Sequence, residues 1–149
     1  MDVSGNISAI LSQKEREIFS VPSDASVFDA VSMLAEKNIG ALLVMDGERL
    51  VGMLSERDYT RKVMLRGKRS RETTVAEIMS TDLKVVSPRE AVQDCLRLMT
   101  DKRIRHLPVL DGDKVIGIIS IGDLVKWVIS CQSAAIDHLE SYIHGGYSG

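Results

Sequence analysis

The sequence has few aromatic residues, only two cysteines, little net charge and no long hydrophobic run. Aromatics make up 4%, which disfavours a base-stacking surface for single-stranded nucleic acid. Cys95 and Cys131 are too few for a disulfide framework and are expected to be reduced thiols. A net charge of −2 gives no general attraction for DNA, RNA or anionic lipid. With no export signal or membrane-spanning run apparent, these absences favour a cytoplasmic protein and disfavour a membrane or disulfide-stabilised one.

The chain does contain an internal repeat. Its 149 residues are 44% hydrophobic and 27% charged, as in an ordinary globular protein of one domain or two small fused units. A shift of 65 positions lays residues 21–63 over residues 86–128 without a gap, and 13 of the 43 aligned positions are identical. The sequence therefore predicts two copies of one supersecondary unit.

Each copy has the pattern helix, strand, strand, helix. Apolar residues at helical spacing, such as Val27 to Leu34 and Val92 to Met99, are followed by two apolar runs that flank Asp46-Gly47 or Asp111-Gly112. An Asp-Gly pair between apolar runs predicts a hairpin. Second helices are expected to start near Glu56 and near Asp123, and residues 66–74 to form an exposed connector. The expected fold class is α/β in the α+β sense, with two small units packed together because one cannot bury both sides of its sheet.

A seven-residue motif ends the second strand of each copy: Gly, two apolar residues, Ser, two residues, Asp. A strand that ends in Ser and turns into a helix leaves backbone N–H groups free for an anion. The Asp carboxylate can accept two hydrogen bonds from a ribose diol, and the glycine permits close approach of a flat ring or a neighbouring backbone. Ser and Asp are also ordinary helix caps, which is the alternative. The motifs comprise Gly52, Ser55 and Asp58, and Gly117, Ser120 and Asp123.

A basic run, residues 102–108, enters the first hairpin strand of the second copy only. Arg105 suits a phosphate, and His106 can add positive charge near neutral pH. The matching residues of the first copy, Gly40 and Ala41, are uncharged, so two sites built this way are not equivalent. The alternative is a solvated charge run, although charges flanked by apolar residues on a half-buried strand are unusual without a ligand.

These features resemble tandem cystathionine-β-synthase (CBS) domains, also called a CBS pair or Bateman module. The similarity covers nearly the whole chain and is greatest to stand-alone bacterial two-CBS proteins and a plant mitochondrial two-CBS protein. It implies CBS domains at 8–66 and 75–144, related by a pseudo-two-fold axis, with two clefts and a homodimeric assembly. The matching segments are residues 38–44, 55–59, 103–109 and 117–123.

The resemblance also implies adenosyl ligands: AMP, ADP or ATP, with NAD(H) possible and S-adenosylmethionine less favoured. Asp58 and Asp123 would bind ribose hydroxyls, and Ser55 and Ser120 would meet phosphate. Arg105 and His106 match phosphate contacts of the family, and Arg57, in the place of Gly122, would reach the opposite phosphate. One cleft is expected to take AMP, and the other AMP or the longer NAD(H). Adenine would lie against Ser20, Val21, Val85, Val86, Leu107 and Pro108.

The leading functional hypothesis is a nucleotide sensor that signals to an unidentified partner protein. The second is a protein-interaction module that works without nucleotide. A basic stretch, residues 57–71, is better explained as a solvated helix face than as a nucleic-acid surface. No catalytic Ser-His-Asp or Cys-His arrangement is apparent, so no catalytic residue or metal is predicted, and an enzyme that processes a nucleotide is the third and less favoured hypothesis.

Overall fold

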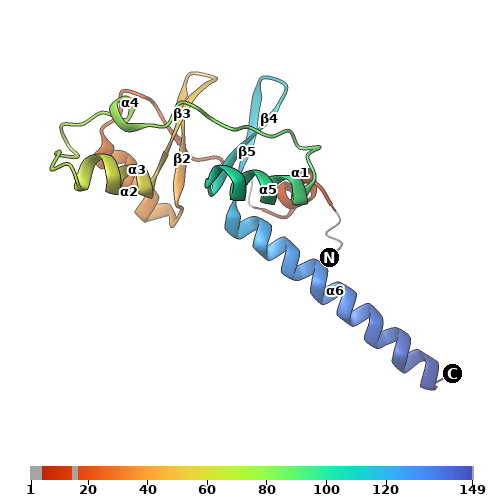
Figure 1. Cartoon of the computed structure of the whole chain (residues 1–149). Coiled ribbons are helices and arrows are strands. Elements are labelled where there is room, and N and C mark those ends of the chain that lie inside the picture. The colour runs from red at the N-terminus through yellow and green to blue at the C-terminus, as the bar shows by residue number, and fades with distance from the viewer. Residues whose placement is uncertain (1–4, 15–16, 149) are drawn as a thin grey trace.

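A computed structural model of the chain shows two small units side by side, with one long helix running away from them (Figure 1). It describes residues 5–14 and 17–148, and the side chains of these residues except 135 and 141–148. The elements alternate as the repeat predicts. In chain order they are α1 (Ile7–Gln13), β1 (Ser20–Val21), α2 (Val27–Lys37), β2 (Ala41–Asp46), β3 (Arg49–Ser55), α3 (Glu56–Tyr59), the π-helix η1 (Thr60–Met64), α4 (Val75–Ile78), α5 (Val92–Lys102), β4 (His106–Asp111), β5 (Lys114–Ser120) and α6 (Ile121–Ser148).

Both predicted hairpins are confirmed. Strands β2 and β3 pair antiparallel, as do β4 and β5. The turn glycines Gly47 and Gly112 have φ of 65° and 62°, a conformation that glycine adopts without strain. In the first unit β1 adds a parallel strand beside β2, and in the second a single parallel bridge from Val86 to Val109 takes its place. The two sheets are thus versions of one design, as the repeat implies.

Each of the two hydrophobic cores includes a short helix that lies next to the other unit in the sequence. We call this arrangement the exchange of helices. Ile7 and Ile10 of α1, at the start of the chain, are buried in the core formed by α5, β4, β5 and α6. Val75 and Ile78 of α4, which precede the second repeat, are buried in the core formed by α2, β2 and β3. Each unit is therefore completed by a helix that lies next to the other unit in the sequence.

The connector, residues 66–74, was expected to be exposed, but part of it is buried. Thr73 is only 5% exposed, and its carbonyl accepts a hydrogen bond of 2.8 Å from the N–H of Val27. The carbonyl of Ser70 accepts another, of 3.0 Å, from Phe28. The first N–H groups of a helix lack partners within it, and the connector satisfies them at the start of α2. These two hydrogen bonds hold part of the connector against the first unit.

The two sheets face each other across a third apolar cluster. Ala41, Leu43 and Met53 of β2 and β3 pack with Val115 and Ile118 of β5. Alternate residues on β2, such as Leu42 and Val44, face the core of the first unit instead. The sheets therefore pack on each other, with helices on their outer sides (Figure 1). Within the described residues, no helix has the length and apolar character needed to cross a membrane.

Candidate functional site

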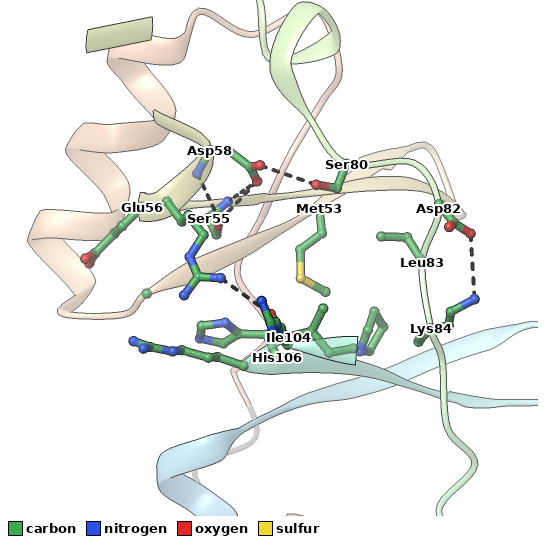
Figure 2. A pocket seen from close by; sticks show the side chains of 15 residues that line it. Met53, Ser55, Glu56, Asp58, Ser80, Asp82, Leu83, Lys84, Ile104 and His106 are labelled. Carbon is green, nitrogen blue, oxygen red and sulfur yellow. Dashed lines mark hydrogen bonds and ion pairs between the residues drawn. The ribbon is translucent and has the colours of Figure 1, made fainter. Parts of the chain in front are cut away.

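Two clefts lie between the units, and each takes residues from both. The first cleft has a volume of about 360 Å³ and joins the Ser55–Asp58 turn to the start of β4. Figure 2 shows Ser55, Asp58 and Ser80 on one side of it and Ile104 and His106 on the other. The full lining is Gly40, Met53, Ser55, Glu56, Arg57, Asp58, Ser80, Asp82, Leu83, Lys84, Arg103, Ile104, Arg105, His106 and Pro108.

The second cleft is the pseudo-two-fold counterpart of the first. Its volume is about 820 Å³, and it joins the Ser120–Asp123 turn to the start of β2. Both volumes suit a small-molecule site, which typically spans about 300–1,000 Å³. The lining is Ile10, Gln13, Lys14, Glu17, Phe19, Lys37, Asn38, Ile39, Gly40, Ala41, Arg105, His106, Ile118, Ser120, Ile121, Gly122, Asp123, Lys126, Trp127 and Ser130.

The Asp58 carboxylate is held by its own turn. One oxygen accepts hydrogen bonds from the backbone N–H of Ser55 at 2.9 Å and from its hydroxyl at 3.1 Å, while the Ser55 hydroxyl oxygen accepts from the Asp58 N–H at 3.2 Å. The other oxygen pairs with Lys62 Nζ at 3.2 Å and accepts from the Ser80 hydroxyl at 3.3 Å. The Asp58 side chain is 13% exposed. The turn is therefore a genuine capping box as well as one wall of the first cleft.

The Asp123 carboxylate has a different lysine. Lys14, which follows α1, places Nζ 2.7 Å from Asp123 Oδ2 and 2.9 Å from the carbonyl of Ile118. The same carboxylate oxygen accepts from the Ser120 N–H at 2.8 Å. Burial alone would raise the pKa of Asp123, but the hydrogen bonds from Lys14 and Ser120 outweigh it and hold the pKa below its usual range. Asp123 is therefore ionised at neutral pH, with a cation already beside it.

Arg105 and His106 line both clefts, so the basic run lies where the clefts meet. A Cβ on Gly40 would stand 3.2 Å from His106 Nε2, so the absence of a side chain there makes room for the imidazole. Burial lowers the pKa of His106 and outweighs the opposing effect of Asp123. Desolvation therefore favours the neutral ring and opposes the positive charge expected of His106 near neutral pH.

Arg57 lines the first cleft and donates a hydrogen bond of 3.4 Å to the carbonyl of Arg103, which ties the two units together. The family resemblance implies that Arg57 reaches the opposite phosphate, but Arg57 does not line the second cleft, where Gly122 occupies the matching position. In this structure Arg57 thus faces the cleft of its own turn.

Five of the predicted residues line neither cleft. Val21, Val86 and Leu107 are buried in the two cores, since they alternate along a strand with neighbours that face outward. Pro108, two residues after His106, does line the first cleft. In the chain segments before α2 and α5, Phe19 lines the second cleft and Lys84 the first. The five are Ser20, Val21, Val85, Val86 and Leu107.

Several cleft residues are not predicted by the sequence motifs. Lys14, Lys37 and Trp127 line the second cleft, and Ser80 and Asp82 line the first. Lys14 lies outside the aligned repeat and Lys37 at the end of a helix, so no local motif marks either one. In the repeat, Trp127 falls at the position of Lys62, and this replacement is the one signal that could have found it.

The motif glycines serve packing between helix and strand. A Cβ on Gly52 would lie 2.6 Å from the sulfur of Met79, and one on Gly117 would lie 2.8 Å from Leu11 Cδ2. Leu11 lies in α1, and Met79 directly follows the last residue of α4. The close approach predicted at these glycines is confirmed: at Gly52 the backbone carbonyl of Ser80 approaches as well as the Met79 side chain, and at Gly117 only the Leu11 side chain does.

Reactive side chains are scarce in the described part of the chain. Cys95 lies in the core as expected, and burial raises the pKa of its thiol to about 11, with the nearby Glu90 and Asp94 adding to the effect. Such a thiol is not a nucleophile at neutral pH. Among the side chains that the structure describes, no group of three or more His, Cys, Asp or Glu could hold a metal ion.

Comparison with known proteins identifies the architecture. The family model "CBS domain" matches twice, at residues 8–65 and 75–130, and the chain therefore belongs to the CBS-domain family as a tandem pair. CBS domain-containing protein CBSX3, mitochondrial, of Arabidopsis thaliana is 40% identical over 84% of this chain and 63% of its own length. CBS domain-containing protein YhcV of Bacillus subtilis is 31% identical over 86% of this chain and 91% of its own.

Solved structures agree. A signal-transduction protein with CBS domains from Burkholderia ambifaria is 49% identical and superposes with a TM-score of 0.83, covering 85% of this chain and 95% of its own. The CBS domain pair of protein MJ0100, solved with 5′-methylthioadenosine and S-adenosyl-L-methionine, shares the fold with a TM-score of 0.75 at 23% identity, over 85% of this chain and 97% of its own. The predicted fold, a pseudo-symmetric α+β CBS pair, is confirmed.

Proposed function

We propose that this chain is a homodimeric regulatory module that binds adenine nucleotides, chiefly AMP, between its two units and signals the binding to a partner protein. The observation that carries the proposal is the construction of the clefts from both units. A ligand that fills a cleft connects the Ser–Asp turn of one unit to the strand entry of the other. Binding would therefore favour one relative packing of the units over others.

The charges of the clefts support an anionic ligand. The first cleft is lined by Arg57, Lys84, Arg103 and Arg105, and the second by Lys14, Lys37, Arg105 and Lys126. Guanidinium and ammonium groups are the usual partners of phosphate. In the proposed complex Ser55 and Ser120 meet the phosphate, and Asp58 and Asp123 accept hydrogen bonds from ribose. The MJ0100 pair, solved with two adenosyl compounds, supports the ligand class.

The two clefts differ in size and wall. The first, of about 360 Å³, suits a compact nucleotide such as AMP. The second, of about 820 Å³, has Phe19 and Trp127 in its wall and room for a longer ligand such as NAD(H). Flat aromatic walls suit nucleobase and nicotinamide rings. The proposal therefore assigns AMP to the first cleft and AMP or NAD(H) to the second.

The test is isothermal titration of nucleotide-stripped protein with AMP, ATP, NADH and S-adenosylmethionine. We expect micromolar binding of AMP with up to two sites per chain. Asp58→Asn and Asp123→Asn should each remove one site, because an amide accepts fewer hydrogen bonds from ribose than a carboxylate. Asp113→Asn, in the β4–β5 turn and outside both clefts, is the matched control. Absence of binding by all four compounds would contradict the proposal.

A second candidate function is a protein-interaction module that needs no nucleotide. It is favoured by the internal partners of the two carboxylates, since Asp58 pairs with Lys62 at 3.2 Å and Asp123 with Lys14 at 2.7 Å. Carboxylates satisfied in this way act as helix caps without any ligand. A partner captured equally well with and without AMP would favour this candidate over the first.

A regulatory role is proposed in preference to a catalytic one. The buried Cys95 thiol, with a pKa of about 11, offers no nucleophile, and the carboxylates of Asp58 and Asp123 are engaged in caps and ion pairs. Product analysis after incubation with AMP, ATP or NADH tests this choice, with unchanged nucleotide as the expected result.

A further inference from the structure

Helix α6 extends well beyond the unit that it closes. Its first turns pack on the core of the second unit through Leu124, which is fully buried, and through Ile121 and Trp127. Beyond these turns the helix runs away from both units (Figure 1). From Val125 to its end at Ser148 it has a length of about 36 Å, at 1.5 Å per residue.

A second apolar stripe follows this extension. Val125, Ile129, Ile136 and Leu139 are 46%, 56%, 55% and 60% exposed. Together with Gln132, these residues follow one another at intervals of four, three, four and three residues. This is the spacing of the core positions of a heptad repeat, and we call the five residues the seam. At 100° per residue the five positions fall within about 40° of one line along the helix, apart from the face that carries Leu124.

The spacing indicates what covers the stripe. Helices owe most of their stability to an apolar face packed in tertiary structure, and a seam with a 3.5-residue period fits another helix with the same period. The charged flank carries Lys126, Asp137 and Glu140, so it lacks the basic character of a helix that lies on a membrane surface. A second copy of this chain supplies a helix of matching length and pattern.

The charges also select an orientation. Lys126 directly follows Val125, and Glu140 directly follows Leu139. Both therefore occupy the same heptad position, at opposite ends of the stripe. In an antiparallel pair these positions face each other, so Lys126 of one copy lies beside Glu140 of the other, twice. We propose that the α6 extensions of two copies pair antiparallel through this seam, with the two-fold axis next to Ser133.

The first test is the mass of the full chain in solution, measured by sedimentation without nucleotide. Ile129→Asp with Ile136→Asp should halve the mass of the wild-type assembly, because four carboxylates would enter the paired seam. The control, Ala134→Asp with His138→Asp, adds two carboxylates to the same helix away from the stripe and outside both clefts, and it should leave the mass unchanged. An equal mass for wild type and seam variant would overturn the proposal.

The second test leaves the seam intact, so it holds even if the seam variant fails to fold. In a Cys131→Ser background, Ser133→Cys places a thiol beside its symmetry mate in the antiparallel pair, and mild oxidation should link two chains. Ala134→Cys, at an exposed position on the opposite face of α6, should not cross-link. Failure of the cross-link at 133 would overturn the antiparallel pairing. Neither test involves ligand, so their failure and that of the nucleotide proposal are distinguishable.

Discussion

At the scale of single residues, His106 joins the two clefts because it lines both and because Gly40 leaves room for its ring. Its half-buried imidazole faces Asp123, Lys14 and Arg105, and its pKa lies below the ordinary value of 6.5. As the pH falls through that ordinary value, the unfolded chain binds a proton that the folded chain does not. His106 therefore lowers the free energy of unfolding on mild acidification.

Replacing His106 with glutamine should flatten this dependence. We expect the loss of unfolding free energy between pH 7 and pH 5, measured by urea denaturation, to be smaller in His106→Gln than in the wild type. The control is His138→Gln, at an exposed position on α6, which should keep the wild-type slope. Identical slopes for all three proteins would show that His106 titrates alike in the folded and unfolded states.

A methyl group at Gly52 should destabilise the fold. It would meet the Met79 sulfur at 2.6 Å and the Ser80 carbonyl oxygen at 3.0 Å, and overpacking of this kind costs about 1–3 kcal/mol. Gly122→Ala is the matched control, because the nearest atom there is 3.6 Å away and the site is helical, so its stability should stay equal or rise. Denaturant midpoints of Gly52→Ala and Gly122→Ala give the comparison, and equal midpoints would contradict the packing role.

At the scale of elements, the exchange of α1 and α4 gives each short helix a role in a distant core. Ile10 of α1 is 4% exposed and packs with the second unit. Ile10→Ala should lower stability by about 2–4 kcal/mol through the cavity that it leaves. The loss of hydrogen-exchange protection should be larger in α5 and β5 than in α2 and β2.

Leu65→Ala serves as the control for this experiment. Leu65 is 74% exposed, so its truncation should change stability by less than about 0.5 kcal/mol. A loss of protection in Ile10→Ala confined to α2 and β2 would contradict the exchange of helices.

The elements also show how far the sequence alone could reach. The repeat at 65 positions predicts the hairpins and both Ser–Asp turns, because their signals are local: Asp-Gly turns, alternating apolar residues and caps. The exchange was out of reach, since α1 and α4 are a few residues long and lie outside the aligned repeat. Lys14 was missed for the same reason, because only the exchange brings it to Asp123, 109 positions away.

At the scale of the whole molecule, the pseudo-symmetry is broken in a way that fluorescence can detect. The chain has one tryptophan, Trp127, and it lines the second cleft. Ligand entering that cleft should therefore change tryptophan emission, while ligand in the first cleft should change it little. Asp123→Asn should abolish the emission response to AMP or NADH. Asp58→Asn should retain the emission response and lose only one of the binding sites counted by calorimetry. The reverse pattern would contradict the assignment of the two clefts.

The exchange of helices has a further consequence for how the protein is made. Ile7 and Ile10 are synthesised long before the core that receives them is complete, because that core also requires Leu124. At 5–20 residues per second the 114 intervening residues take roughly 6–23 s to synthesise. During that interval the nascent chain carries a short apolar helix with no place to pack. Folding of the second unit thus waits until Leu124 has been added, and a ribosome that stalls before that point leaves the two isoleucines of α1 unburied.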